Sequence, residues 1–126
     1  MTRLTAYLDR LEDTLRSRHE LTILSLRYRQ MSGKGNFRAH VRFYNESELI
    51  IREEIEESYH QEIERIKYVF QYQGEDGTLI FRYDNAPHFP DLPTFPSHKH
   101  TPDGVIAADT PDLTDVLQEI DAILYP

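Results

Sequence analysis

The sequence predicts a single α+β domain in which two amphipathic helices cover one face of a mainly antiparallel sheet of five strands. Three observations lead to this fold class. Apolar residues recur every three to four positions at both ends of the chain, they alternate with polar residues between about residues 20 and 84, and glycine-rich turns interrupt that alternation. A hydrophobic content of 39% in 126 residues is enough for one core, so we expect residues 1–126 to form one domain.

The two ends of the chain carry the helix signals. Residues 2–18 start with Thr2, a residue type that caps helices, and continue with one apolar stripe. That stripe is Leu4, Tyr7, Leu8, Leu11 and Leu15. Near the C-terminus, Thr110 is placed as an N-cap, Pro111 at the first helical position and Asp112 in the first turn. The second apolar stripe is Leu113, Val116, Leu117, Ile120 and Leu124.

The central region predicts strands because its apolar and polar residues alternate. The side chains expected to point into the core are Leu24, Leu26 and Tyr28, then Phe37, Ala39, Val41 and Phe43, then Leu49, Ile51 and Ile55, then Tyr68, Phe70 and Tyr72, and finally Leu79, Phe81 and Tyr83. Gly33–Asn36 and Gly74–Gly77 provide the turns of two hairpins. The charged stretch 56–65 fits a helix or a loop, and its structure stays open.

A segment rich in proline and histidine separates the predicted sheet from the last helix. Residues 85–104 contain five of the seven prolines and three of the six histidines. Long loops inside compact domains are often functional, so we expect an ordered loop or a flap here.

Composition excludes several classes of protein. The absence of cysteine rules out disulfides, thiol catalysis and cysteine-type zinc sites. No apolar run approaches the roughly 20 residues that span a bilayer, and the N-terminus has no signal-peptide pattern, so we expect a cytoplasmic protein without membrane contact. The net charge of −8 is unevenly distributed, because residues 1–42 carry +5 and residues 43–126 carry −13. A local nucleic-acid surface in the basic part is compatible with that asymmetry.

A cationic group is expected on the polar face of the first hairpin. Alternation places Arg27, Arg29, Arg38, His40 and Arg42 on one side. Arginine binds phosphate bidentately, so Arg27, Arg29, Arg38 and Arg42 are candidate substrate-binding residues for an RNA backbone. The alternative is a cross-strand charge lattice with the acids of the third strand, Glu48, Glu54 and Glu56.

A second group of candidate residues lies where the last strand enters the proline-rich segment. Pairing Gln73 with Thr78 in the second hairpin places Lys67 opposite Asp84, with Arg82 on the same face. His98 and His100 are two residues apart and point to one side of an extended chain. The candidate catalytic residues are Arg82, Tyr83, Asp84, His88, His98, Lys99 and His100.

These residue types suit metal-independent cleavage of RNA. Histidine can take the 2′-hydroxyl proton and protonate the leaving oxygen, while Arg82 and Lys99 stabilise the phosphorane. The favoured reading therefore needs no cofactor. Two alternatives stay open: a divalent metal such as zinc held by His88, His98 and His100, with Asp84, Asp91 or water completing its sphere, and a purely structural loop.

The segments Phe81–His88, Phe95–His100 and Pro111–Leu113 resemble the pattern of the TumE-type toxin family. The resemblance is specific over residues 66–124, whereas over the first 65 it rests on length and on the order of elements. It implies the toxin of a two-gene module whose partner is a small helix-turn-helix antitoxin. The layout also looks like that of RelE-type ribonucleases, which is a fold-level analogy only.

Together these observations predict a toxin that acts as a small endoribonuclease. The alternative is a non-enzymatic module that binds a protein or a metal. The acidic stretch 46–64 favours a narrow RNA site over a broad one. Phe89, Leu92 and Phe95 lie beside the candidate histidines, and we expect them to be the apolar anchors for the antitoxin.

Overall fold

The computed structural model describes residues 2–126, which form two helices and seven strands. In chain order the elements are α1 (Arg3–Arg16), β1 (Leu21–Met31), β2 (Lys34–Phe43), β3 (Glu48–Glu57), β4 (Ile63–Gln73), β5 (Leu79–Asp84), β6 (His98–Thr101), β7 (Gly104–Ala107) and α2 (Leu113–Leu124). The strands form one sheet in the order of the sequence, and each is antiparallel to the next. The architecture is therefore an antiparallel meander with a helix at each end of the chain.

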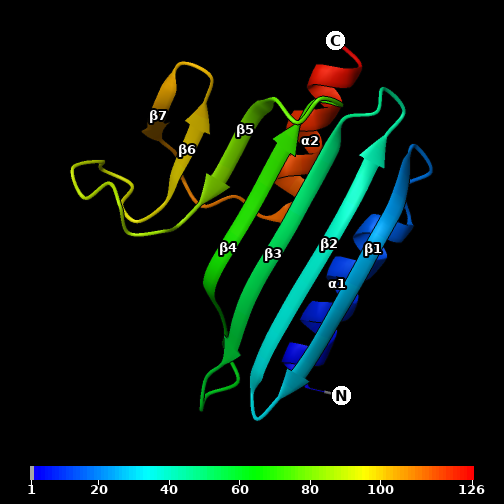
Figure 1. Ribbon diagram of the computed structural model, residues 1–126. Helices are drawn as coiled ribbons and strands as arrows, with labels where there is room; N and C mark the ends of the chain where they lie inside the picture. Colours follow the sequence, from blue (N-terminus) through cyan, green and yellow to red (C-terminus); the bar gives the residue numbers. More distant parts are fainter. Residues whose placement is uncertain (1) are drawn as a thin grey trace.

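Both helices lie on the same side of the sheet, α1 behind its β1 end and α2 behind β4 and β5 (Figure 1). We call the side with the helices the helix face and the other side the open face. The core fills the space between the helices and the sheet, and both predicted helical stripes are buried in it, Tyr7 being partly exposed. Burial of one such leucine or phenylalanine side chain stabilises the fold by about 1.5–3 kcal/mol. The predicted α+β class and the two amphipathic helices are confirmed.

Local hydrogen bonds explain where the helices begin. The Thr2 hydroxyl accepts a hydrogen bond from the Thr5 backbone N–H, as an N-cap should. At α2 the cap is Asp112 and not Thr110, because Asp112 and Asp115 form a reciprocal capping box. The predicted start of this helix was therefore two residues too early. Neither helix is long and apolar enough to cross a membrane.

The sheet has seven strands and not the five expected from the sequence. The two additional strands, β6 and β7, form a hairpin, and β6 with the first residue of β7 lies in the segment 85–104 that we expected to be a loop or flap. β6 consists of His98, Lys99, His100 and Thr101, so it lacks the apolar alternation that predicts a strand. It forms a strand because it pairs with β5. Within the segment 85–104, residues 85–97 and the turn at Pro102 and Asp103 lack strand structure.

Two further details of the predicted sheet were wrong. Asp84 pairs with Val69 and not with Lys67, because a bulge at Tyr72 and Gln73 and a turn closed between Gly74 and Thr78 shift the register by two residues. From Phe81 to Asp84 the shift is even, so these side chains keep the predicted face. Leu79, which we expected in the core, pairs instead with Gln73, and Ile80 packs against the core. In β1 a bulge between Ile23 and Ser25 turns Leu24 outward, and Ile23 packs against the core instead.

The stretch 56–65, which the sequence left open, contains the end of β3, a short turn and the start of β4. A backbone hydrogen bond from Ser58 to Glu62 closes the turn, and Gln61 adopts a positive φ of 62° within it. The two long strands are therefore one continuous hairpin.

Candidate functional site

The candidate site lies on the open face, at the end of the sheet where β5 and β6 pair. The register places Asp84 opposite His98 and Arg82 opposite His100. Because side chains alternate along a strand, these four point to the same face. The prediction that His98 and His100 share a side is confirmed.

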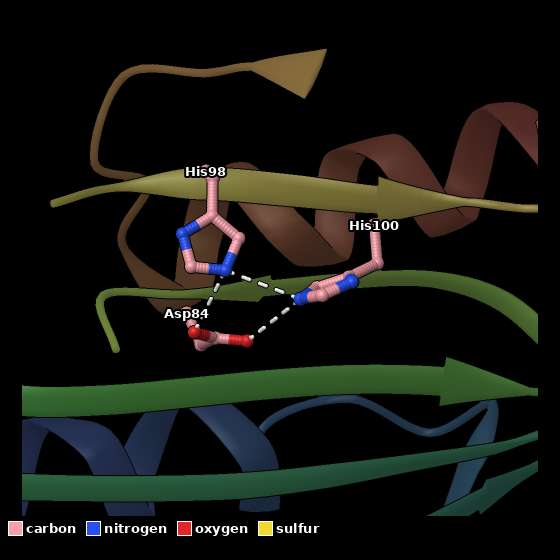
Figure 2. A group of neighbouring side chains, drawn as sticks. All are labelled: Asp84, His98 and His100. Carbon is pink, nitrogen blue, oxygen red and sulfur yellow. Dashed lines mark hydrogen bonds and ion pairs between the residues drawn. The ribbon is translucent and has the colours of Figure 1, made fainter. Parts of the chain in front are cut away.

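Asp84, His98 and His100 converge on one point, and we call them the Asp84 cluster (Figure 2). The Asp84 Oδ1 atom lies 3.0 Å from His98 Nε2, and Oδ2 lies 3.3 Å from His100 Nε2. The two Nε2 atoms are 3.1 Å apart. Three side chains that bind protons or metals therefore meet within hydrogen-bond distance.

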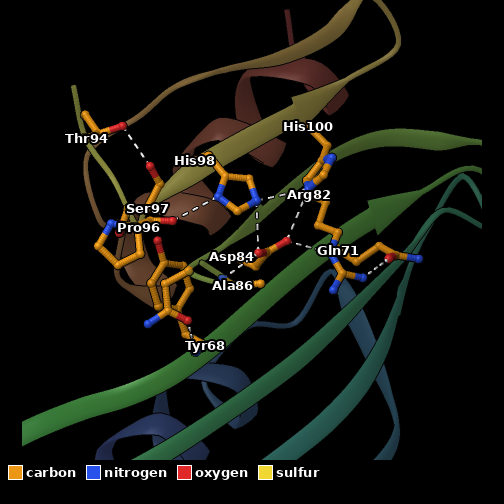
Figure 3. Close-up of polar contacts among 11 residues, drawn as sticks. Tyr68, Gln71, Arg82, Asp84, Ala86, Thr94, Pro96, Ser97, His98 and His100 are labelled. Atoms are coloured by element: carbon orange, nitrogen blue, oxygen red, sulfur yellow. Dashed lines mark hydrogen bonds and ion pairs between the residues drawn. The ribbon is translucent and has the colours of Figure 1, made fainter. Parts of the chain in front are cut away.

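A second layer of contacts holds the Asp84 cluster in place (Figure 3). The Ala86 backbone N–H donates to Asp84 Oδ1 at 2.9 Å, and Arg82 Nε donates to Oδ2 at 2.9 Å. Arg82 is itself positioned by Gln71, whose Oε1 atom accepts from Nη1 at 2.9 Å. His98 Nδ1 lies 2.9 Å from the Pro96 carbonyl oxygen, to which it donates its proton. The carboxylate of Asp84 and the ring of His98 are thus oriented by neighbours outside the cluster.

The segment 85–97 covers part of the cluster. Phe89 packs its edge against the rings of His98 and His100, at centroid distances of 4.7 and 5.9 Å. Asp84 and His98 are only 3% and 1% exposed, whereas the His100 side chain is 29% exposed. A ligand from solvent can therefore reach the cluster on the side of His100.

Electrostatics favour an ionised Asp84 beside a neutral His100. Burial alone would raise the pKa of Asp84, but the hydrogen bonds from Arg82 and Ala86, together with the charge that His98 carries when protonated, outweigh burial and hold that pKa below its ordinary value. Burial lowers the pKa of His100, although Asp84 acts in the opposite sense. The cluster is therefore a carboxylate that faces imidazole nitrogen atoms.

Two predicted catalytic residues, Tyr83 and Lys99, lie on the helix face instead. Lys99 Nζ donates to Glu119 Oε2 of α2 at 2.7 Å, and the Tyr83 hydroxyl donates to Glu119 Oε1 at 2.5 Å. Burial and this carboxylate raise the pKa of Tyr83. Alternation alone separates these residues from the cluster, since each lies between two residues of the open face.

His88 does not join the cluster either. It is exposed on the segment 85–97, as is Asp91, and among residues 2–126 the only group of acids and histidines that converges as metal ligands do is the Asp84 cluster. The trio of His88, His98 and His100 that we considered as a metal site is therefore not assembled, because the loop carries His88 away from β6.

The cationic group of the first hairpin divides into two parts. Arg42 lies 3.5 Å from Glu46 and from Glu48, and His40 also pairs with Glu48, so the charge lattice that we considered exists at this end. Within the described residues, the other predicted arginines form no ion pair and are exposed. These are Arg27, Arg29 and Arg38.

The register connects these arginines to the Asp84 cluster across the sheet. Arg27 pairs with Arg38, Arg38 with Arg52, Arg52 with Val69, and Val69 with Asp84. We call Arg27, Arg38 and Arg52 the arginine row. The row begins beside an open groove of about 740 Å³ at the β1 edge. The groove is lined by Glu12, Arg16, Leu26, Arg27, Tyr28, Arg29, Asn36 and Arg38.

Comparison with known proteins identifies the family. The family described as Toxin TumE matches residues 9–124, which is nearly the whole chain. The chain belongs to the TumE toxin family. Searches of curated proteins and of solved structures returned no match. The predicted resemblance to TumE-type toxins is confirmed, while the likeness to the RelE-type layout stays a prediction.

Membership in the TumE family has two consequences. A toxin family implies an antitoxin partner, and the matched range includes the Asp84 cluster and the arginine row. Sequence reasoning missed two residues of this site, Arg52 and Gln71. Arg52 lies in an acidic stretch, but it shares the parity of Glu48 and Glu54 on β3, and that parity was the signal that could have found it.

Proposed function

We propose that this TumE-family chain is the toxin of a toxin–antitoxin pair and that it cleaves RNA in the cytoplasm at the Asp84 cluster. The observation that carries the proposal is the alignment of three unpaired arginines with the cluster along one row of the sheet. Membership in a toxin family supports the first part, and the chemistry of the row and the cluster supports the second.

The arginine row fits a phosphate backbone. Neighbouring strands are about 4.8 Å apart, so the backbone of Arg52 lies about 10 Å from that of Asp84, and Arg27 about 19 Å from it. A single strand of RNA laid along the row would meet one guanidinium after another and then reach the cluster. Backbone contacts of this kind position a strand without reading its bases.

The cluster and Arg82 together supply what cleavage by a neighbouring 2′-hydroxyl requires. The reaction needs a group that takes the hydroxyl proton, a group that gives a proton to the leaving 5′-oxygen, and a cation that stabilises the phosphorane. We assign the two proton transfers to the Asp84 cluster as a unit, because His100 gives it access to solvent. We assign the third task to Arg82, which uses two of its N–H donors on Asp84 and Gln71 and keeps three of its five free.

Incubation of the purified protein with RNA, followed by mapping of the new ends, tests the proposal. We expect ends with a 2′,3′-cyclic phosphate or a 3′-phosphate. His100→Gln should reduce the cleavage rate by about 100-fold or more, which is the usual contribution of a general base or acid. His88→Ala is the matched control, because it removes an exposed histidine outside the cluster and should leave the rate unchanged.

The same variants should behave in parallel in cells, where His100→Gln relieves growth arrest and His88→Ala does not. His98→Ala should also relieve arrest, but His98 is buried and that variant needs a folding check. Equal toxicity of wild type and His100→Gln, with no RNA cleaved, would favour a non-enzymatic toxin that acts by occupying a partner.

We further propose that the partner is a small helix-turn-helix antitoxin that docks on the segment 85–97. Phe89 packs on the histidines of the cluster, while Phe95 is 44% exposed and has no aromatic neighbour within the described residues. Phe95 is therefore available as an apolar anchor. An antitoxin bound there would lie beside the entrance to the cluster.

A further inference from the structure

The proton positions in the Asp84 cluster leave a space that suits a cation. His98 donates Nδ1–H to the Pro96 carbonyl, so a neutral His98 presents only a lone pair at Nε2. That lone pair faces Asp84 Oδ1 at 3.0 Å and His100 Nε2 at 3.1 Å. Several electron-pair donors thus point at one another, and such an arrangement requires protons or a metal ion between them.

The distances match the coordination sphere of a metal ion. In a tetrahedral zinc site with bonds of about 2.0–2.1 Å, neighbouring ligand atoms lie about 3.3 Å apart. In the cluster, the two Nε2 atoms are 3.1 Å apart, His98 Nε2 lies 3.0 Å from Asp84 Oδ1, and His100 Nε2 lies 3.3 Å from the other carboxylate oxygen, Oδ2. An ion held by the two imidazoles could therefore take one or both carboxylate oxygens after small shifts of the side chains.

The surroundings have the second layer of contacts that metal sites need. Metal-binding histidines usually donate their other ring N–H to a carbonyl or carboxylate, and ligating carboxylates are themselves hydrogen-bonded. His98 donates to Pro96, and Asp84 accepts from Ala86 and Arg82. Asp84 and His98 are also buried, so the site is formed before any ligand arrives.

We propose that Asp84, His98 and His100 bind one divalent transition-metal ion of the zinc type, with at least one coordination position open toward solvent. Two imidazoles and one carboxylate are the ligand set of catalytic zinc sites, and the partly exposed His100 leaves the open position accessible. This departs from the metal-independent chemistry that the sequence favoured, and it differs from the alternative metal site that we considered because His88 is not a ligand.

Binding of the ion stands on this geometry alone, and only its use in catalysis rests on the proposed function. A bound zinc ion would polarise the phosphate and lower the pKa of a water in its open position, and the hydroxide so formed could take the 2′-hydroxyl proton. Arg82 would keep its place beside the phosphate.

The test is metal binding by the purified, full-length protein without a histidine tag, stripped with chelator and titrated with zinc chloride. We expect one zinc ion per chain by calorimetry and elemental analysis, with an increase in Tm because the ion binds the folded state. His100→Gln should weaken binding by at least 100-fold, since the loss of an outer partner alone costs about 10–100-fold. Asp84→Asn, which keeps the shape of the side chain, should do the same.

His88→Ala is the control and should bind zinc as wild type does. Absence of zinc binding by wild type, or equal affinity in wild type, His100→Gln and Asp84→Asn, would overturn the inference and leave the cluster held by protons. An RNA assay separates this result from the proposed function. Cleavage that continues in chelator would refute the use of the ion in catalysis and leave the proposed function intact, whereas zinc binding without cleavage of any RNA would refute the proposed function only.

Discussion

The arginine row makes a quantitative prediction about the salt dependence of RNA binding. Each phosphate that a cation neutralises on a single strand contributes about −0.7 to the slope of log K against log salt concentration. If Arg27, Arg38 and Arg52 each contact one phosphate, replacing all three with glutamine should make the slope less steep by about 2. Between 50 and 200 mM salt, the three contacts together should reduce the affinity of wild type by about 20-fold. The triple variant should lack this part of the salt dependence.

Binding can be measured by fluorescence anisotropy with a labelled single-stranded RNA at several salt concentrations. All proteins should carry His100→Gln, so that the RNA stays intact. The control is Arg10→Gln, because Arg10 is exposed on α1, on the other side of the sheet, and its loss changes the net charge by the same amount per residue.

Local contact and overall charge then give different results. Contact along the row predicts that Arg52→Gln alone reduces the slope by about 0.7, whereas Arg10→Gln leaves it unchanged. The same slope in the triple variant and in wild type, or an equal loss in Arg10→Gln, would refute the assignment of this face to RNA.

Two other predictions concern folding and the partner. Glu53 is buried and accepts a hydrogen bond from Tyr7, and burial raises the pKa of Glu53 above its ordinary value. The contribution of Glu53 to the stability of the fold is therefore fully present below its pKa in the unfolded chain. That contribution is lost as the pH rises through its pKa in the folded protein. We expect Glu53→Gln to gain stability over wild type as pH rises above about 4.5, in urea unfolding across a pH series; a difference that does not change with pH would contradict this. For the antitoxin, Phe95→Ala should weaken binding by about 1–2 kcal/mol in calorimetry, while Ile123→Ala on α2, which is also 44% exposed, should not. Unchanged affinity in Phe95→Ala would leave the segment 85–97 as a fold element only.

The faces of the sheet were predictable because alternation along a strand survives errors in register. The predicted pairing of Lys67 with Asp84 was off by two residues, yet Arg82 and Asp84 still share the open face. The same rule separates Tyr83 from them, although the sequence-based grouping placed it with the catalytic residues. The two-residue period of a strand therefore predicts reliably which face of the sheet a side chain occupies, but it predicts poorly which residue lies opposite on the next strand.

The Asp84 cluster itself could not be derived from the sequence. It depends on the pairing of β6 with β5 after the 13 residues from 85 to 97. The sequence of β6 has no apolar side chain from which a strand could be predicted. The same loop decides that His98 and His100 meet Asp84 while His88 remains exposed. Where strands lack an alternating apolar pattern, their pairing is determined by backbone hydrogen bonds and by the path of the connecting loop. Neither of these can be predicted from the amino-acid composition.

The charge distribution explains how a chain of net charge −8 can offer a surface to RNA. The sequence divides into a basic and an acidic half, but the fold separates charge by face. On the helix side, α2 carries three acids and no base, and α1 carries three of each. On the open face, the arginine row and the adjacent row of Arg29, Asn36, Glu54 and Lys67 together contain five cations and one acid. Because exposed charges more than about 10 Å apart are largely screened at physiological salt, an RNA strand bound to the open face, as we propose, would experience mainly these two rows and little of the acidic helix layer.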